Sequence, residues 1–549
     1  MKNFIKLLII SLSLYSCDVD RFPYDSIASE ELLSGEGGIE AATLGNYAIL
    51  KGDADGNGFA SQFHRIAEYP GDNVALSGTT TDALFFTYNY NNLTTSGRVN
   101  DFWTSGYQAI VGCNKMIELT TEGESEETDQ LIGENYYLRA YAYFEMVNVL
   151  GRPYYQGRDN LGIPLKLSSL IDDLPDRNTV GEVYDQVVSD LIKAESLMTV
   201  NKSNSYATKE AAQALLSRVY LYMGDNEQAI NYANKVIDCG RFSLVSSENL
   251  PNYTKLNPDD NSETIFCFKF LEESDYNHGY YTVGSLYANI LGSGWGEMYA
   301  SSDYLDLLRK NPSDQRLKFI DPQYLLDDAG EKIPAVYWIN DNYQYVFKRT
   351  FENGSETYFT NEGTDFLLQS EVNGPQTRYY YLNTSGDKKY VIKDFDMVKR
   401  NGYPKFFILK CSLQEDVPQL WSPVVSRLAE VYLNRAEAYA KLNQTENALA
   451  DVNRIRSRAS IATYIDPSDF PEGIDILDVV LQERRMELAY EGHRKFDVFR
   501  NGRTMNRKYP GTHLNGNSPR FEIPATDNRV IEYIPEAQIN VQPSLIQND

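Results

Sequence analysis

The sequence predicts a mainly α-helical protein in which large irregular insertions interrupt a repeated helical scaffold. Three observations lead to this prediction. Helical periodicity dominates two long zones, at about 100–240 and 422–500, and parts of these zones repeat each other. The segment between them is rich in Gly, Asn, Asp, Tyr and Thr. With 549 residues the chain is too long for one ordinary core, so we expect two or more packed regions.

The helical repeats are recognised by an arginine and a tyrosine one helical turn apart. The pattern occurs at Arg139 and Tyr143, at Arg218 and Tyr222, and at Arg435 and Tyr439. The last two are followed by a turn and then by EQAI at 227–230 or ENAL at 446–449. Alanines at helix crossings let two helices approach closely, which is typical of tetratricopeptide-like units. Because the repeats are not contiguous, we expect a tetratricopeptide-like scaffold with insertions.

The two insertions, at about 51–95 and 243–419, are expected to be loop-rich. Short strand-like pieces occur in the second, namely AVYWI, YQYVFKRTF and RYYYLN. Irregular segments on a rigid scaffold carry binding residues more often than the scaffold does. We therefore expect the ligand here.

The N-terminus has the features of an export signal. Two lysines precede a short apolar run in MKNFIKLLIISLSLYSC, and that run is too short to span a bilayer. A signal peptide is predicted at 1–16, and LYSC resembles a lipobox that would place a lipid on Cys17. A plain secretory signal is the alternative. The polar stretch 17–35 would then be a tether, and the lipid the only membrane anchor.

Composition and motifs argue against several classes of function. The net charge of −26 makes nucleic acid an improbable partner, since phosphate contacts need a basic surface. DADGNG at 53–58 resembles the start of an EF-hand, but the twelfth position holds His64 where a glutamate is needed, so a turn is favoured. The four histidines show no metal-binding spacing, and no nucleotide-binding or hydrolase motif is present. We predict neither a metal nor a cofactor.

The stretch LQERRMELAYEGHRKFDVFR, at 481–500, has the charge density of an active site. Treated as one helix, it places Glu483, Glu487 and Glu491 along one face, with Arg494 beside them and Lys495 four residues after Glu491. Two glycosidase carboxylates must flank the scissile bond, whereas these project the same way. We therefore expect a structural ion-pair network with partners from a neighbouring helix, and not a catalytic centre.

The chain resembles the SusD/RagB-like family of outer-membrane nutrient-binding lipoproteins. The resemblance rests on motifs in matching order, including the lipobox at Cys17, FWTSGYQAIVGCNKMI, YYLRAYAYFEMVNVLGRPYY, SRLAEVYLNRAEAYAKL, ERRMELAYEGHRKFDVFRNG and YIPEAQINVQPSLIQND. It implies a cell-surface, lipid-anchored protein without catalytic activity. Such a protein would capture a glycan or other nutrient and deliver it to a TonB-dependent transporter.

Aromatic residues beside polar groups in the insertions are the candidate glycan platforms. They are Phe85, Phe86, Tyr88, Tyr90 and Asn91 in the first insertion, and Tyr280, Tyr281, Trp295 and Tyr299 in the second. A core role for any of them is at least as plausible. Two alternatives stay open: a scaffold that only stabilises a transporter, and a glycoside hydrolase. The predicted regions are 1–16, 17–35, 36–242, 243–419 and 420–549.

Overall fold

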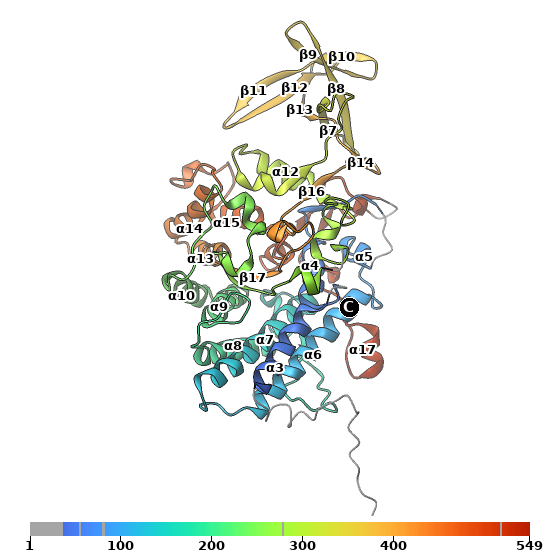
Figure 1. The fold of residues 1–549 in the computed structure, drawn as a ribbon. Helices are drawn as coiled ribbons and strands as arrows, with labels where there is room; N and C mark the ends of the chain where they lie inside the picture. The colour runs from blue at the N-terminus through green and yellow to red at the C-terminus, as the bar shows by residue number, and fades with distance from the viewer. Residues whose placement is uncertain (1–36, 54–55, 79–82, 277–278, 516–518) are drawn as a thin grey trace, which may run out of the picture.

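The computed structural model describes residues 37–549 except 54–55, 79–82, 277–278 and 516–518. The predicted signal peptide, Cys17 and the tether therefore lie outside the described residues. The described chain is mainly helical, with one larger sheet at one end of the molecule, so the predicted fold class is confirmed (Figure 1). Within the described part of the chain, no helix combines the length and apolar character needed to cross a bilayer.

The N-terminal region is a stack of antiparallel helices. They are α3 (Gly38–Lys51), α4 (Phe59–Glu68), α6 (Gly97–Leu119), α7 (Glu126–Leu150), α8 (Val180–Leu197), α9 (Lys209–Met223) and α10 (Asn226–Asp238). Side chains cap the starts of α6 to α10, as where the Thr179 hydroxyl accepts a hydrogen bond from the Glu182 amide before α8. Gly224 ends α9 in a left-handed conformation, with φ 82°, which a residue without Cβ adopts easily.

The C-terminal repeat continues this stack in space. It consists of α13 (Leu428–Lys441), α14 (Thr445–Arg458), α15 (Ile476–Glu487) and the short α16 (Arg494–Phe499), with α17 (Glu536–Val541) near the end of the chain. Helix α13 packs on α10 and α9, although about 190 residues separate α10 from α13 in sequence. Ala229 and Ala438 meet Leu221 at this junction. The repeats are thus contiguous in space.

The arginines of the repeat pattern join helices. Arg139 on α7 forms a two-pronged ion pair with Asp190 on α8, at 2.6 and 2.8 Å. Arg435 on α13 does the same with Asp451 on α14, at 2.8 Å for both contacts. Arg218 on α9 instead reaches Glu430 on α13 across the junction between repeats. The pattern noted in the sequence is therefore an inter-helix contact.

The second insertion forms a curled antiparallel sheet of seven strands in the order β10-β9-β8-β7-β13-β12-β11. The strands are β7 (Pro334–Ile339), β8 (Tyr345–Asn353), β9 (Glu356–Asn361), β10 (Thr364–Leu367), β11 (Gln369–Asn373), β12 (Gln376–Leu382) and β13 (Lys388–Phe395). The three strand-like pieces seen in the sequence lie in β7, β8 and β12. The sheet curls around its own small core, where the rings of Phe359 and Tyr381 meet edge to face at 5.1 Å.

Six short strand pairs occur in the described chain; one joins the two insertions, and one joins the second insertion to the C-terminal repeat. Each pair is antiparallel: β1 (Val74–Leu76) with β5 (Met298–Ala300), β2 (Leu161–Pro164) with β3 (Arg177–Thr179), β4 (Thr264–Cys267) with β17 (Val424–Arg427), β6 (Ile320–Pro322) with β16 (Phe406–Ile408), β14 (Lys399–Arg400) with β15 (Tyr403–Pro404), and β18 (Met505–Asn506) with β19 (Glu522–Ile523). The first pair brings the two predicted insertions side by side.

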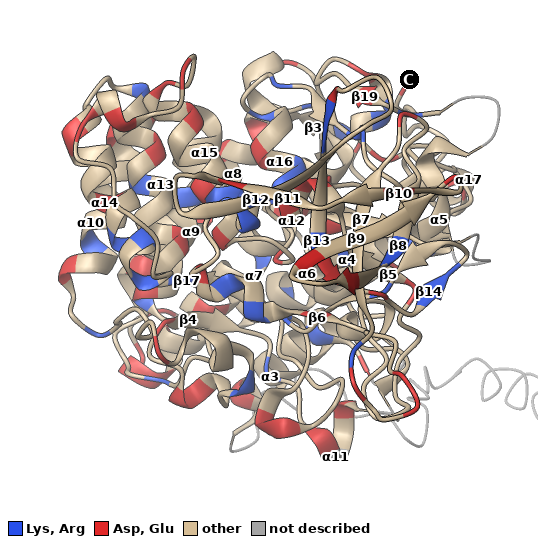
Figure 2. Ribbon diagram, turned by 90° about the horizontal axis from the view of Figure 1, so that it is seen from above, with Lys and Arg blue, Asp and Glu red and all other residues tan. Residues whose placement is uncertain are grey.

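Three short helices also lie in the insertions: α5 (Leu84–Tyr88), α11 (Glu272–Asp275) and α12 (Ser302–Arg309). The first insertion is therefore less irregular than expected, because 51–95 contains both α4 and α5. The sequence FASQFHRIAE of α4 is strongly amphipathic, but its polar residues face the interior, where His64 and Glu68 are buried. Seen from above the sheet, acidic residues mark α10, α14 and α11 (Figure 2).

Candidate functional site

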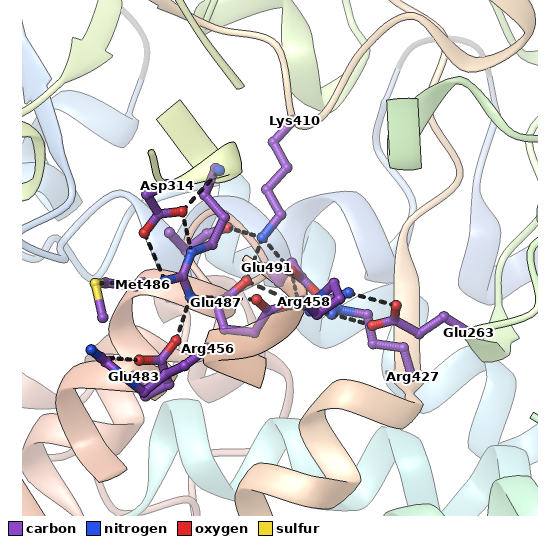
Figure 3. A network of polar contacts seen from close by, with 12 residues as sticks. Glu263, Asp314, Lys410, Arg427, Arg456, Arg458, Glu483, Met486, Glu487 and Glu491 are labelled. Atoms are coloured by element: carbon purple, nitrogen blue, oxygen red, sulfur yellow. Dashed lines mark hydrogen bonds and ion pairs between the residues drawn. The ribbon is translucent and has the colours of Figure 1, made fainter. Parts of the chain in front are cut away.

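The charged stretch at 481–500 contributes to a buried network of ion pairs. Glu483, Glu487 and Glu491 meet cations from several different segments (Figure 3). Those cations are Arg316, Lys410, Arg427, Arg456 and Arg458, and Glu263 and Asp314 complete the set. The side chains of these ten residues are at most 7% exposed.

Arg427 lies at the centre of this network. Its guanidinium contacts the carboxylates of Glu263 at 2.6 Å, Glu487 at 2.7 Å and Glu491 at 2.7 Å. It also donates a hydrogen bond to the backbone oxygen of Glu487 at 2.9 Å. Arg458 pairs with both Glu263 and Glu487 from α14. Every buried carboxylate named here has at least one cation within ion-pair distance.

The network keeps the carboxylates of Glu487 and Glu491 ionised. Burial alone would raise the pKa of Glu491, but Arg427 and Lys410 outweigh burial and lower that pKa to about 2. For Glu487, burial likewise opposes ionisation, and Arg458, Arg427 and Arg316 lower its pKa well below the ordinary value. A general acid needs a carboxyl that holds a proton near neutral pH, and these two do not.

The structure corrects the prediction that residues 481–500 form one helix. Helix α15 ends at Glu487, and α16 begins at Arg494. Between them Tyr490 and Gly492 have φ of 67° and 82°, and their amides donate hydrogen bonds to the buried carboxylate of Glu68. Glu491 therefore lies in a turn and not on the helical face it was expected to share.

Two further expectations about this stretch were wrong. Arg494 does not accompany the glutamates, because its guanidinium pairs with Asp72, at 2.7 and 2.8 Å. Glu491 pairs with Arg427 and Lys410 instead of Lys495. The partners of the glutamates also come from more than a neighbouring helix: Arg316 belongs to a short 3-10 helix (Gln315–Phe319), and Lys410 to a loop.

The candidate ligand residues separate into buried and exposed groups. Tyr88, Tyr90 and Tyr299 are at most 2% exposed and lie in the hydrophobic core. Arg507 packs its guanidinium against the rings of Tyr88 and Tyr90. These three tyrosines are therefore not available to a ligand at the surface.

The remaining candidates are exposed or partly exposed. Trp295 is 55% exposed, and its ring meets that of Tyr280 at 5.2 Å in a T-shaped arrangement. The indole Nε1 donates a hydrogen bond to the backbone oxygen of Tyr280, at 3.2 Å, which fixes the orientation of the ring. Tyr281 is also exposed. Phe86 is at the surface against the partly buried Phe85, and Asn91 is exposed.

A polar cleft that the sequence did not reveal begins at Ser77, which bonds to Glu297 just before β5. It has a volume of about 660 Å³ and is formed by the segments 77–78, 342–345, 401–403 and 510–515. Among the residues that the structure describes, no lysine, arginine, aspartate or glutamate lines it, and its lining includes the amides of Asn342 and Asn401 together with tyrosine rings. Ser77 joins this cleft to the segment that follows Trp295, since its amide and hydroxyl both donate to the backbone oxygen of Glu297.

Neither a metal cluster nor a disulfide occurs among the described residues. Cys113, Cys267 and Cys411 are buried, whereas Cys239 is exposed. His64, which takes the place of the EF-hand glutamate, is buried and shares a hydrogen bond with the Tyr287 hydroxyl at 3.1 Å. The part of the site that the structure describes therefore offers rings, amides and hydroxyls for binding.

A helical-repeat scaffold that presents exposed rings and a neutral cleft on its insertions belongs to the class of ligand-binding proteins. Comparison with known proteins identifies the family. The chain belongs to the SusD family, whose model matches residues 262–549. A second model, described as starch-binding and associating with the outer membrane, matches residues 52–221. The resemblance seen in the sequence is confirmed.

Individual relatives are similar over nearly the whole chain. A SusD-like protein of Formosa agariphila is 25% identical over 523 residues, covering 91% of each chain. A SusD superfamily structure from Bacteroides thetaiotaomicron has a TM-score of 0.71 at 26% identity, covering 93% of this chain and 99% of that one. A structure described as a SusD-like carbohydrate binding protein of Bacteroides vulgatus has a TM-score of 0.63 at 17% identity, with coverage of 93% and 97%, and this likeness concerns the fold alone.

Proposed function

We propose that this protein is a cell-surface lipoprotein that captures a glycan and delivers it to a TonB-dependent outer-membrane transporter. Membership of the SusD family supports the proposal, together with the family description of outer-membrane association. In this proposal Cys17 carries the lipid, and no reaction is catalysed.

The observation that carries the glycan part is the exposed ring pair of Tyr280 and Trp295. The C–H face of a sugar ring packs on an aromatic face, and an aromatic ring fixed by its own hydrogen bond loses little freedom on binding. The polar cleft that begins at Ser77 supplies amides and hydroxyls that can bond sugar hydroxyl groups. This combination favours a glycan without charge at this site.

The position of the site also fits surface capture. The start of α3, which follows the predicted tether, lies at the end of the molecule remote from the sheet (Figure 1). A lipid on Cys17 would therefore hold that end towards the membrane. We propose that the helical side contacts the transporter while the insertions face the nutrient.

The test measures binding of the purified protein to a panel of neutral polysaccharides and oligosaccharides by calorimetry. Removal of a central aromatic contact commonly costs about 2 kcal/mol, which corresponds to roughly a thirtyfold loss of affinity. We expect Trp295→Ala to have this effect. The matched control is Tyr155→Ala, an aromatic residue that is 48% exposed on the scaffold. Absence of binding to every glycan in the panel would contradict the glycan part.

The transporter part needs a separate experiment in cells. We expect Cys17→Ala to release the protein from the outer membrane, and antibodies to label the wild type on intact cells. Isolation of the wild type in a complex with a TonB-dependent transporter would support delivery. If Trp295→Ala and Phe86→Ala left nutrient uptake unchanged, a protein that only stabilises the transporter would be the better description.

A further inference from the structure

A second cleft lies between the curled sheet and α12. Its volume is about 690 Å³. Helix α12 forms one wall, with Leu305 and Leu308 anchored in the core beneath it. The other wall consists of β7, β13 and the β11–β12 hairpin, which extends beyond the helical body (Figure 1). The two walls meet where the Arg309 guanidinium donates a hydrogen bond to the Tyr337 hydroxyl at 2.5 Å.

The charge of this cleft is opposite to that of the chain. Four basic residues line it, Arg309, Lys310, Arg378 and Lys393, against a single acidic residue, Asp306. The whole chain has 51 basic and 77 acidic residues. A surface drawn evenly from this composition would carry more acids than bases. The basic lining is therefore a local feature, and it contrasts with the uncharged cleft that begins at Ser77.

Three of these cations have no ion-pair partner in the part of the chain that the structure describes. Among these four cations, Arg309 alone forms an ion pair with a described residue, Asp394, at 3.9 Å. Lys310, Arg378 and Lys393 form no ion pair within 4.0 Å with a described residue. Glu371, the nearest acid on the hairpin, is engaged by Lys388 and by the Tyr390 hydroxyl. The lining of the cleft thus keeps an excess of basic over acidic side chains, although Asp306, Glu371 and Asp394 lie close to it.

Aromatic rings orient part of this charge. The Arg378 guanidinium lies 3.8 Å from the centre of the Tyr390 ring, and Tyr390 is 42% exposed. A guanidinium can contact a ring face and still offer N–H groups for two-pronged contacts with a carboxylate or sulfate group. Asn373 and Gln376, at the hairpin end, add amides that can bond hydroxyl groups.

We propose that the cleft between α12 and the sheet binds an anionic saccharide segment, one that carries carboxylate or sulfate ester groups. Arg378, Lys310 and Lys393 neutralise the anionic groups, Tyr390 contacts a sugar ring, and the hairpin amides bond hydroxyls. That the ligand is a saccharide rests on the proposed function. That the ligand is anionic is inferred from the lining of this cleft alone.

The experiment compares saccharides that differ only in charge. Calorimetry on the full-length protein measures binding of an oligogalacturonate and of its fully methyl-esterified counterpart, which has the same backbone without carboxylates. An O-sulfated oligosaccharide and its desulfated counterpart form the second arm. We expect at least one anionic member to bind tenfold or more tightly than its neutral counterpart. We also expect binding to weaken between 50 mM and 500 mM salt, because salt screens charge–charge attraction.

Substitutions in the cleft test whether the anionic saccharide binds there. We expect the double change Arg378→Gln and Lys310→Gln to weaken binding of the anionic saccharide at least tenfold. The matched control is Lys389→Gln, which removes an exposed cation from β13 outside the cleft. Both changed residues lie at or near the surface, and circular dichroism verifies folding. If the double variant is unstable, Lys310→Gln alone is used, with a threefold loss expected.

Three results would overturn the proposal: equal affinity for the charged and neutral counterparts in both arms, an equal loss in Lys389→Gln, or no binding of any anionic saccharide. A protein that binds only phosphorylated peptide or nucleic acid through this cleft would count against it as well. A negative result in these experiments differs from a failure of the proposed function, because the proposed function is tested separately, with neutral glycans and the Trp295→Ala variant.

Discussion

Replacement of Arg427 by methionine tests whether the buried network stabilises the fold. Methionine retains much of the length of the side chain and removes its charge. Glu263, Glu487 and Glu491 would each lose a contact of 2.6 or 2.7 Å. Because the side chain of Arg427 is only 3% exposed, water cannot readily replace it. Removal of one partner from a buried ion pair typically costs about 3–5 kcal/mol.

The pKa of Glu491 gives the size of this stabilisation independently. Its value of about 2, against 4.5 for an ordinary glutamate, corresponds to about 3 kcal/mol of favourable interaction in the ionised form, at about 1.4 kcal/mol per pKa unit. Arg427 is the largest of the contributions that lower this pKa, and Lys410 is the next. Glu487 and Glu263 keep Arg458 in the variant. We therefore expect a loss of about 3 kcal/mol at pH 7.

The assay is urea unfolding monitored by tryptophan fluorescence, with Arg158→Met as the control. The Arg158–Asp185 pair is on the surface, with both side chains 54% exposed, so the urea midpoint of this variant should equal that of the wild type. A lowered folded-state pKa means that the stability from Glu491 is complete above pH 4.5 and is lost as the pH falls towards 2. The difference in the free energy of unfolding between wild type and Arg427→Met should therefore become smaller as the pH falls from 4.5 towards 2. An Arg427→Met midpoint within error of the control would refute the reasoning.

Three further predictions concern single groups. Burial, with a smaller effect of Arg65, lowers the pKa of His64 to about 3. The stability that the neutral imidazole contributes is therefore complete above pH 6.5 and is lost as the pH falls below that value. His64→Asn should flatten the dependence of the urea midpoint on pH between 6.5 and 3. Alkylation followed by peptide mapping should modify Cys239 first, because burial raises the pKa of the Cys113 thiol to about 12 and shields it. Purified wild type should release no reducing sugar from glycans that it binds, and a turnover that Glu483→Gln abolishes would overturn the structural interpretation of the network.

The sequence was most informative where local pattern and packing agree. The helical periodicity of α7, α9 and α13 reflects the face that each buries, and Arg139 and Arg435 each fix the next helix of their repeat. The strand-like pieces were recognised, but not the single sheet that they form, since pairing between strands distant in sequence leaves no mark on each strand alone.

The expectations failed where tertiary contacts override local preference. The glutamate spacing at 483–491 fits a helix, yet Tyr490 adopts a positive φ because buried contacts with Glu68 and Asn73 hold it. Tyr88, Tyr90 and Tyr299 lie in aromatic-rich segments like those of the exposed rings, and only the packing of the insertions decides which rings reach the surface. Both clefts combine segments far apart in sequence, so no local motif could have identified them.

The network also explains how a scaffold of contiguous repeats holds an insertion of about 180 residues. Glu263 lies near the beginning of that insertion, Arg316 in its middle and Lys410 near its end, and all three meet the charges around Glu487, Glu491 and Arg427. Ion pairs at these points fasten the insertion to α14 and α15, while the chain between them is free to form loops and the sheet. The helical junction of α10 with α13 does not depend on those intervening segments. A charged stretch that lines neither cleft thus holds the insertion that carries the proposed binding residues, and Arg427→Met should weaken glycan binding as well as the fold.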